Sequence, residues 1–225
     1  QKSITFLDTP GHAAFTGMRE RGASAADIAV LVVSAEDGVK AQTLEALNTI
    51  LNAKIPFVVA INKVDLPEAN IEKTKLSLAE NNVLVEGYGG DIPWNPISAK
   101  KGDGVSELLE TIVLVADLAE LKYDPSLLAE GVVIESKLEP KRVIAATIIK
   151  KHGTLKRNQF VVAGNAFATT RIMENFLGKS VENVSAGTPV QLVGFDKLPE
   201  VGATIKTFDK KRSAEDYIEE QKFNT

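Results

Sequence analysis

The sequence of 225 residues contains no cysteine and only two histidines. The first absence excludes disulfides, thiolate metal sites and a cysteine nucleophile, and the second argues against a histidine-based metal site. No apolar run approaches the roughly 20 residues that a membrane-spanning helix needs, and no signal segment opens the chain. The net charge of −4 excludes a strongly basic domain that wraps nucleic acid. We therefore expect a cytoplasmic protein whose contacts with RNA, if any, use a local face.

The composition, 44% hydrophobic and 25% charged, allows one large or two ordinary domains with real cores. In the first half of the chain, apolar strand-like runs alternate with helical patterns, which is typical of βαβ units and a parallel sheet. We expect strands at 2–7, 28–33, 56–61 and 94–97, and helices at 13–23, 41–53, 69–81 and 102–121. The run at 28–33 is rich in β-branched residues, which predicts burial on both faces. In the helix at 13–23 we expect Arg19, Glu20 and Arg21 to point outward.

The pattern changes after 122–126, which we interpret as a linker. Short strand-like runs then follow without helices between them, and this predicts a small antiparallel β-barrel. The expected strands are 131–138, 143–151, 159–163, 166–173, 188–193 and 203–208, and a polar helix is expected at 212–223. The predicted fold is therefore an α/β domain over 1–122, a β-barrel over 127–210 and the start of a helix over 211–225.

The run Asp8-Thr9-Pro10-Gly11-His12 follows the first apolar strand and precedes a helix. A carboxylate at such a place can hold Mg²⁺ through water, and a glycine N–H can approach a terminal phosphate because no Cβ blocks it. Taken alone, the five residues fit a simple turn at the end of a strand equally well.

Two later stretches strengthen the functional interpretation. Asn62-Lys63-Val64-Asp65 ends the apolar run 56–61, and Ser98-Ala99-Lys100 ends the run 94–97. Open α/β sheets bind ligands at the carboxyl ends of their strands, where all three motifs are predicted to lie. A carboxylate such as Asp65 suits guanine, which offers N1–H and N2–H₂ as paired donors, whereas adenine has no such pair.

The order of these motifs resembles that of guanine-nucleotide-binding domains. Phe6-Leu7-Asp8-Thr9-Pro10-Gly11-His12-Ala13-Ala14-Phe15, followed by Met18-Arg19-Glu20-Arg21-Gly22-Ala23, resembles bacterial-type translation initiation factor two, including its organellar forms. The similarity covers nearly the whole chain. It implies an incomplete P-loop-type G domain from switch II onward, followed by the translation-factor barrel and the start of a linker helix. It also implies a GTP-binding factor that promotes initiator tRNA binding and ribosomal subunit joining, and hydrolyses GTP when intact.

The resemblance also implies roles for the motif residues. Asp8 would hold Mg²⁺ through water, Gly11 would sense the γ-phosphate, and His12 would orient the attacking water, with a structural turn histidine as the alternative. The other binding residues are Thr9 and Pro10 in the switch, Asn62 and Asp65 for guanine selection, Lys63 and Lys100 against the base, Val64 and Ser98 in the loops, and the Ala99 N–H. The implied cofactors are GTP or GDP and Mg²⁺.

Two parts of such a G domain are missing from the 225 residues. There is no Gly-x-x-x-x-Gly-Lys-Ser/Thr phosphate loop and no first switch; the only Gly-Lys-Ser lies at 178–180, with Met173 where a glycine is required, and is expected to be a hairpin turn. Losing three or four charge-assisted hydrogen bonds removes about 5–10 kcal/mol of nucleotide affinity. We therefore expect a piece of a longer factor that is inactive and binds neither nucleotide nor Mg²⁺ on its own.

The missing phosphate loop also removes a strand. In this family the strand before the phosphate loop separates the strand corresponding to 2–7 from that corresponding to 28–33. Either these two strands then pair directly, or 2–7 is left as an exposed apolar edge.

The resemblance predicts the ribosome as partner, through the barrel for the small subunit and through the switch region for the GTPase centre of the large subunit. Initiator tRNA would bind only regions beyond Thr225, and the organellar matrix is an alternative to the cytoplasm. The other functions considered are a catalytically silent ribosome-binding module and a translational GTPase of the elongation type. Lys150, Lys151, Lys156 and Arg157 are expected to form a solvated face of the barrel, with ribosomal RNA phosphates as an alternative contact.

Overall fold

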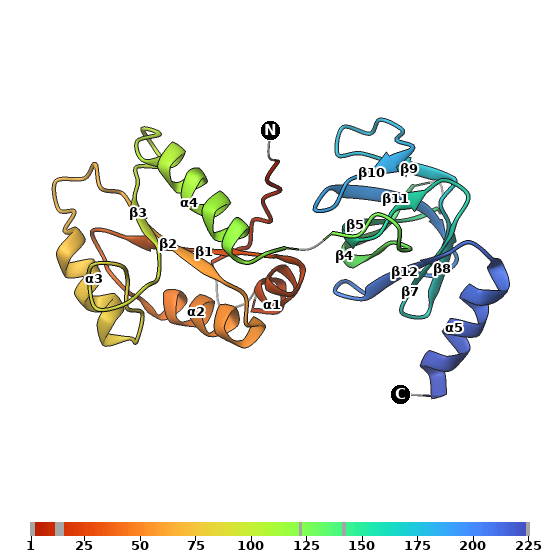
Figure 1. Ribbon diagram of the computed structural model, residues 1–225, viewed down its shortest axis with the longest axis horizontal. Coiled ribbons are helices and arrows are strands. Elements are labelled where there is room, and N and C mark those ends of the chain that lie inside the picture. The colour runs from red at the N-terminus through yellow and green to blue at the C-terminus, as the bar shows by residue number, and fades with distance from the viewer. Residues whose placement is uncertain (1–2, 12–15, 122, 141–142, 224–225) are drawn as a thin grey trace. The chain divides into compact units, whose positions relative to one another are not determined.

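The computed structural model describes residues 3–11, 16–121, 123–140 and 143–223 (Figure 1). The backbone divides into two compact units. The first spans Leu7–Leu121, and the second spans Lys122–Thr225 together with Ser3–Phe6. The expected α/β fold is confirmed in the first unit and the barrel-like antiparallel sheet in the second.

The first unit is built on a parallel sheet of three strands. These are β1 (Ala29–Ser34), β2 (Phe57–Asn62) and β3 (Trp94–Pro96), in the order β1-β2-β3. Ser34 pairs with Asn62 and Ile61 pairs with Pro96, so that all three strands end at the same edge of the sheet. This edge is where the sequence predicts the functional loops to lie.

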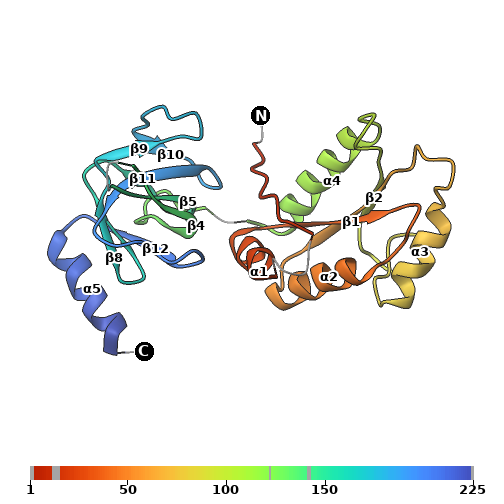
Figure 2. The same cartoon turned by 180° about the vertical axis from the view of Figure 1, so that it is seen from behind.

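Helices cover both faces of this sheet (Figures 1 and 2). The helices are α1 (Thr16–Ala25), α2 (Ala41–Ala53), α3 (Ile71–Glu80) and α4 (Val105–Leu118). Leu47 and Ile50 of α2 and Leu78 of α3 pack with Leu31, Val33, Val59 and Ile61 on one face. Leu108, Ile112 and Val115 of α4 pack with Val58 and Ala60 on the other. The continuous apolar run of β2 therefore corresponds to a strand buried on both faces, with successive side chains packing on opposite sides.

The expected strand at 2–7 is not formed in its described part, residues 3–7. Residues 3–11 have no regular secondary structure, and the side chains of Ile4 and Phe6 are 37% and 64% exposed. Neither expected arrangement occurs: within the described residues β1 pairs only with β2, and the prediction that β1 is buried on both faces fails at Val32, which is 55% exposed. A strand at 2–7 would lack the central neighbour that supplies its hydrogen bonds and covers its apolar side, so ordering it brings too little burial to offset the lost backbone entropy.

The second unit is a curled antiparallel sheet with one core. Its seven strands run in the order β8 (Ala166–Thr169), β7 (Phe160–Ala163), β12 (Thr204–Phe208), β4 (Glu130–Leu138), β5 (Ile144–His152), β11 (Pro189–Phe195) and β9 (Ile172–Glu174). Val133, Ile148, Leu192 and Ile205 belong to the core cluster between them.

Two details of the barrel differ from the expectation. The single strand expected at 166–173 is split into β8 and β9, because the Thr170 hydroxyl donates to the Lys156 carbonyl at 2.6 Å and its N–H to that of Gln159, which bends the chain. A short pair, β6 (Leu155–Lys156) with β10 (Asn183–Val184), was not expected from the sequence. The Gly-Lys-Ser run lies in the turn after β9, where Gly178 has φ +70°, as predicted for a hairpin turn.

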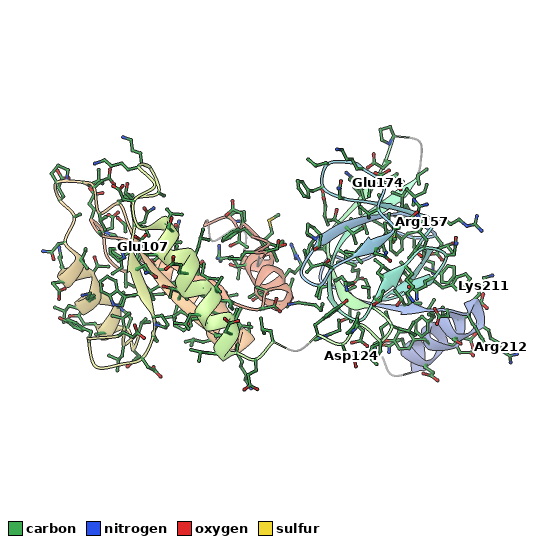
Figure 3. All side chains as sticks on the ribbon, turned by 45° about the horizontal axis from the view of Figure 1, so that its top comes forward. Glu107, Asp124, Arg157, Glu174, Lys211 and Arg212 are labelled. Carbon is green, nitrogen blue, oxygen red and sulfur yellow. The ribbon has the colours of Figure 1, made fainter. Side chains whose placement is uncertain are left out.

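Lys150 contradicts the prediction of a solvated basic face. Its side chain is completely buried, and Nζ donates to the Gly153 carbonyl at 2.5 Å and to the Tyr123 hydroxyl at 3.1 Å. The hydrogen bond from Lys150 lowers the pKa of the Tyr123 phenol. Thr154 donates to the Pro125 carbonyl at 2.6 Å, and Asp124, labelled in Figure 3, accepts from Ser126 in the same linker segment. Lysine is usually exposed, but Lys150 can be buried because these hydrogen bonds replace the ones that its ammonium group would make with water.

The helix expected at 212–223 is confirmed as α5 (Lys211–Phe223). Tyr217 packs its ring on Phe208 of β12, with 5.3 Å between the ring centroids, and Ala214 is buried. Lys211 and Arg212 lie at its exposed start (Figure 3). Among the described residues, no helix has the length and apolar character required to traverse a lipid bilayer.

Candidate functional site

Two loops lie side by side at the carboxyl edge of the parallel sheet. The first, Asn62–Asp65, continues from β2, and the second, Ser98–Lys100, follows β3. Hydrogen bonds between the two segments extend past the strands, from the Ile97 N–H to the Ile61 carbonyl at 2.8 Å and from the Val64 N–H to the Ile97 carbonyl at 3.3 Å. The parallel pairing of β2 and β3 therefore brings these two sequence motifs together.

Asn62 joins the two loops through its side chain. Its Oδ1 accepts hydrogen bonds from the N–H of Lys63 at 2.8 Å and from the N–H of Ala99 at 3.0 Å. Its main-chain carbonyl accepts from the N–H of Ala35 at 2.8 Å, which ties it to the end of β1 as well. The carboxamide therefore sets the spacing of the two loops, because one oxygen satisfies two backbone donors.

Asp65 is held as a carboxylate by the second loop. A hydrogen bond from the Ser98 side chain is the main cause that lowers the pKa of Asp65, and the cations of Lys101 and Lys100 lower it further. Ser98 is fully buried and is itself fixed, because its N–H donates to the Asp103 carbonyl at 2.9 Å and its hydroxyl accepts from the Lys101 N–H at 3.2 Å. Ser98 therefore orients an ionised acceptor.

Lys63 turns toward the loop that follows β1. Its backbone has φ +67°, a left-handed conformation uncommon for residues other than glycine. Its Nζ lies 3.7 Å from Oε2 of Glu36 and 3.8 Å from Oδ2 of Asp37. The sequence analysis missed Glu36 and Asp37 as neighbours of the site; the only signal was their place in the short loop that follows a buried strand.

The segment Asp8–Gly11 is separate from these two loops. It is exposed, and Asp8 makes no hydrogen bond or ion pair with any other residue that the structure describes. Gly11 faces Gln42 in the first turn of α2, where a Cβ on the glycine would meet Oε1 at 3.5 Å. The Pro10 carbonyl accepts a hydrogen bond from Nη1 of Arg19 at 3.0 Å. His12, the predicted catalytic residue, lies outside the described residues.

Arg19 also corrects a prediction from the sequence. Instead of pointing outward from α1, its side chain is only 5% exposed, whereas the apolar Met18 is 45% exposed. The reason is an acidic partner on another helix, Glu45 of α2, which lies 2.7 Å from Nη2.

The Asp65 carboxylate can accept hydrogen bonds from two neighbouring N–H donors, and as an ionised group it has no hydrogen to donate. Asp65 supplies two carboxylate oxygens in a fixed orientation, while the side chains of Lys63 and Lys100 flank the same loops. The described residues contain no group of three or more histidine, aspartate or glutamate side chains that could hold a metal ion. A single carboxylate that reaches a cation through water does not require such a group.

Two family models match the chain. The elongation factor Tu GTP-binding domain matches residues 1–117, and domain 2 of elongation factor G matches residues 128–208. The first match covers the sheet and both loops of the site, and the second covers the antiparallel unit.

Two of the curated relatives that match the chain share one name. Translation initiation factor IF-2 of Dehalococcoides mccartyi is 46% identical over 222 residues, which is 99% of this chain and 37% of that protein. Translation initiation factor IF-2 of Finegoldia magna is 46% identical over 221 residues, which is 98% of this chain and 29% of that protein. The chain thus spans about a third of the length of these relatives.

Solved structures show the same two-unit fold. GDP-bound aIF5B from Aeropyrum pernix has a TM-score of 0.71 and 25% identity, with 96% of this chain and 45% of that one covered. Elongation factor SelB from Methanococcus maripaludis, in complex with the GTP analogue GppNHp, has a TM-score of 0.70 and 25% identity, with 91% and 46% covered.

Proposed function

Because this chain belongs to the translational GTPase family, we propose that it is the nucleotide-binding and barrel portion of an initiation factor that binds GTP and hydrolyses it. The predicted resemblance to initiation factor two is confirmed by 46% identity over nearly the whole chain. Since the chain spans only part of its relatives, its activity, nucleotide and partners are inferred from the site and from the family. We assign 1–122 to the G domain, 127–210 to the barrel and 211–225 to a linker helix.

The observation that carries the proposal is the pair of loops fastened by Asn62 and Ser98. In it, the Asp65 carboxylate accepts the N1–H and N2–H₂ donors of guanine, and the pKa lowered by Ser98 keeps it ionised. Adenine would leave those oxygens without donors, and a buried unmatched acceptor carries a penalty of about 1–3 kcal/mol. The stems of Lys63 and Lys100 cover the faces of the base, and the Ala99 N–H completes the pocket.

On the phosphate side we assign Asp8 to Mg²⁺ through water, because its carboxylate is exposed and has no partner among the described residues. Gly11 contacts the γ-phosphate through its N–H, and His12 orients the attacking water. Thr9 and Pro10 shape this loop. When bound, Mg²⁺ neutralises charge on the phosphates during transfer.

We further propose that these 225 residues alone do not bind GTP at micromolar concentration. They contain no Gly-x-x-x-x-Gly-Lys-Ser/Thr motif. In P-loop NTPases this motif supplies the backbone N–H groups and the lysine on the phosphates, as well as the hydroxyl on Mg²⁺. The base-recognition loops are present without that contribution.

Calorimetry on a chimera tests the proposal. The part of the Dehalococcoides mccartyi factor that precedes its matched region is joined to this chain, and GTP, GDP and ATP are titrated into the chimera and into the unmodified chain. The chimera is expected to bind GTP and GDP, to show no binding of ATP and to hydrolyse GTP slowly. Preference for ATP, or no nucleotide binding by a folded chimera, would reject the proposal.

The ribosome is the proposed partner in the cytoplasm or an organellar matrix. We assign the small subunit to the barrel and the GTPase centre of the large subunit to the switch region, and initiator tRNA to other domains of the intact factor. A catalytically silent ribosome-binding module is the second candidate, favoured by the separate core of the barrel. A pull-down of residues 127–212 with small subunits, with and without nucleotide, tests the module, since failure to bind under either condition rejects it.

A further inference from the structure

Arg19 is a buried arginine in the polar helix α1. Its side chain is 5% exposed, although the expected position for an arginine in a short surface helix is solvent. A guanidinium remains charged at any physiological pH, so burial is stable only where its donors meet acceptors. The groups that accept hydrogen bonds from Arg19 therefore indicate its structural role.

Among the residues that the structure describes, the hydrogen bonds from Nη1 and Nη2 of Arg19 reach three different segments. Nη1 donates to the Pro10 carbonyl at 3.0 Å, within the Asp8–Gly11 loop. Nη2 donates to the Thr16 hydroxyl at 3.0 Å, at the start of α1, and to Oε2 of Glu45 in α2 at 2.7 Å. The two outer nitrogens of one planar group thus join the loop to α2, whose Glu45 lies 26 residues after Arg19 in the chain.

Two close approaches place the loop against both helices. A Cβ on Gly22 of α1 would meet Cγ2 of Thr9 at 2.8 Å, so that a larger residue there would push against the loop. Gly11 lies against Gln42, in the turn of α2 just before Glu45. The loop has no backbone pairing of its own among the described residues, and Arg19 provides its charged attachment.

We propose that Arg19 is a positioning residue, anchored by Glu45, which holds the Asp8–Gly11 loop at a fixed place on α2. The inference rests on the proposed function for its consequence, which is that the loop reaches the γ-phosphate in one orientation. Because α2 directly follows the loop after β1, whose Glu36 and Asp37 lie beside Lys63, the same helix connects the phosphate side to the base side. Displacement of α2 is thereby transmitted to Pro10.

The guanidinium is needed for geometry as well as charge. A lysine at this position has a single nitrogen, so it can keep the ion pair with Glu45 or the contact with Pro10 but cannot span both as two separate nitrogens do. Arg19→Lys therefore retains much of the attachment between α1 and α2 while releasing the loop. A residue that only stabilised the fold would not separate these two effects.

Pulsed electron paramagnetic resonance on the full chain tests the proposal without nucleotide. Because the chain has no cysteine, Asp8→Cys and Asn48→Cys create the only two thiols for nitroxide labels, one on the loop and one on the exposed side of α2. Arg19→Ala, Arg19→Lys and Glu45→Gln are compared in this background. Glu72→Gln is the matched control, since Glu72 forms an ion pair of 2.8 Å with Lys75 on α3, in the same unit.

Loss of a charge-assisted hydrogen bond is expected to raise the fraction of detached loops roughly tenfold to a hundredfold, which broadens the distance distribution. Arg19→Lys and Glu45→Gln should broaden it with little change in the unfolding midpoint reported by Trp94, while Glu72→Gln leaves it narrow. If Arg19→Ala unfolds the unit, these two milder variants decide the question. A distribution equally narrow in all folded variants overturns the proposal, and it leaves the function proposed above untouched.

The chimera supplies the functional measurement. There, Arg19→Lys is expected to lower kcat for GTP hydrolysis while leaving KM for GTP unchanged, because the base loops still hold the nucleotide. A raised KM with unchanged kcat contradicts a positioning role. A chimera that binds no GTP contradicts the proposed function instead, and the label distances remain valid in that case.

Discussion

The base-side loops and the phosphate-side segment of the candidate site are held in different ways. Asn62–Asp65 and Ser98–Lys100 sit on two paired strands and are cross-linked by one carboxamide oxygen and one buried serine. The segment at 3–11 has no strand beneath it and is attached through the side chain of Arg19. Both stretches are recognisable sequence motifs. Only the base-side loops are held in place by paired strands among the described residues.

The difference shows that the presence of a sequence motif does not determine how its residues are held in place. Asn62 follows a strand whose central residues Val59 and Ala60 are completely buried, so its place is determined by the core. Asp8 follows a run whose Phe6 is 64% exposed, so its place is determined by whatever contacts the loop makes. Variants that alter one side should therefore leave the other unaffected.

The largest expected effect is on nucleotide choice. In the chimera, Asp65→Asn should weaken GTP binding roughly a hundredfold to ten-thousandfold, because two charge-assisted hydrogen bonds to the base are lost. An asparagine offers one donor and one acceptor, which match the O2 and N1–H of xanthine, so binding of xanthosine triphosphate should improve. Calorimetry with both nucleotides measures the exchange. Equal weakening for both would show that Asp65 does not contact the base edge.

The next effect contrasts the two strand-like runs directly. Val59→Ala should lower the free energy of unfolding of the first unit by about 2 kcal/mol, because a fully buried side chain loses its packing. Phe6→Ala, despite its larger side chain, should change it by less than about 0.5 kcal/mol. Fluorescence of Trp94, the only tryptophan, follows the urea unfolding of this unit. A large loss with Phe6→Ala would show that the run ending at Leu7 packs against this unit in solution.

A smaller effect is expected from the cross-link itself. Asn62→Ala removes the acceptor of the Lys63 and Ala99 N–H groups and should destabilise the unit by about 1 kcal/mol, since both donors can turn to water. The label distribution between positions 8 and 48 should not change. Asn52→Ala, on the exposed side of α2, is the matched control and should have almost no effect. Loosening of the Asp8 label by Asn62→Ala would contradict the independence of the two sides.

The smallest effect is on pH dependence. The Ser98 hydrogen bond lowers the pKa of Asp65 below its ordinary value of 3.8, so its contribution to stability is present above that value and lost as the pH falls through the lowered pKa. Ser98→Ala should move the Asp65 pKa back upward. Carboxyl chemical shifts measured by NMR across the acid range report it. An unchanged Asp65 pKa in this variant would mean that Lys101 and Lys100, rather than Ser98, set it.

The sequence by itself determined the order and type of the elements that bury apolar surface. The buried runs of β1 and β2, the helices α2 and α4 and the strands of the barrel follow from side-chain periodicity, which the core enforces. It also determined the family and the residues of the base-side loops, because the strand before each loop is specified by its own apolar residues.

The tertiary structure alone decided which partners were available. The run at 2–7 has the composition of a strand, but its residues 3–7 are irregular because a strand needs neighbours and burial that no local pattern supplies. Arg19 is buried because Glu45, distant in sequence, and the Pro10 carbonyl accept its hydrogen bonds. Lys150 is buried because the nearby Gly153 carbonyl and the distant Tyr123 hydroxyl accept hydrogen bonds from its Nζ. A charge is excluded from the interior by default, and only the folded chain can place the acceptors that reverse this rule.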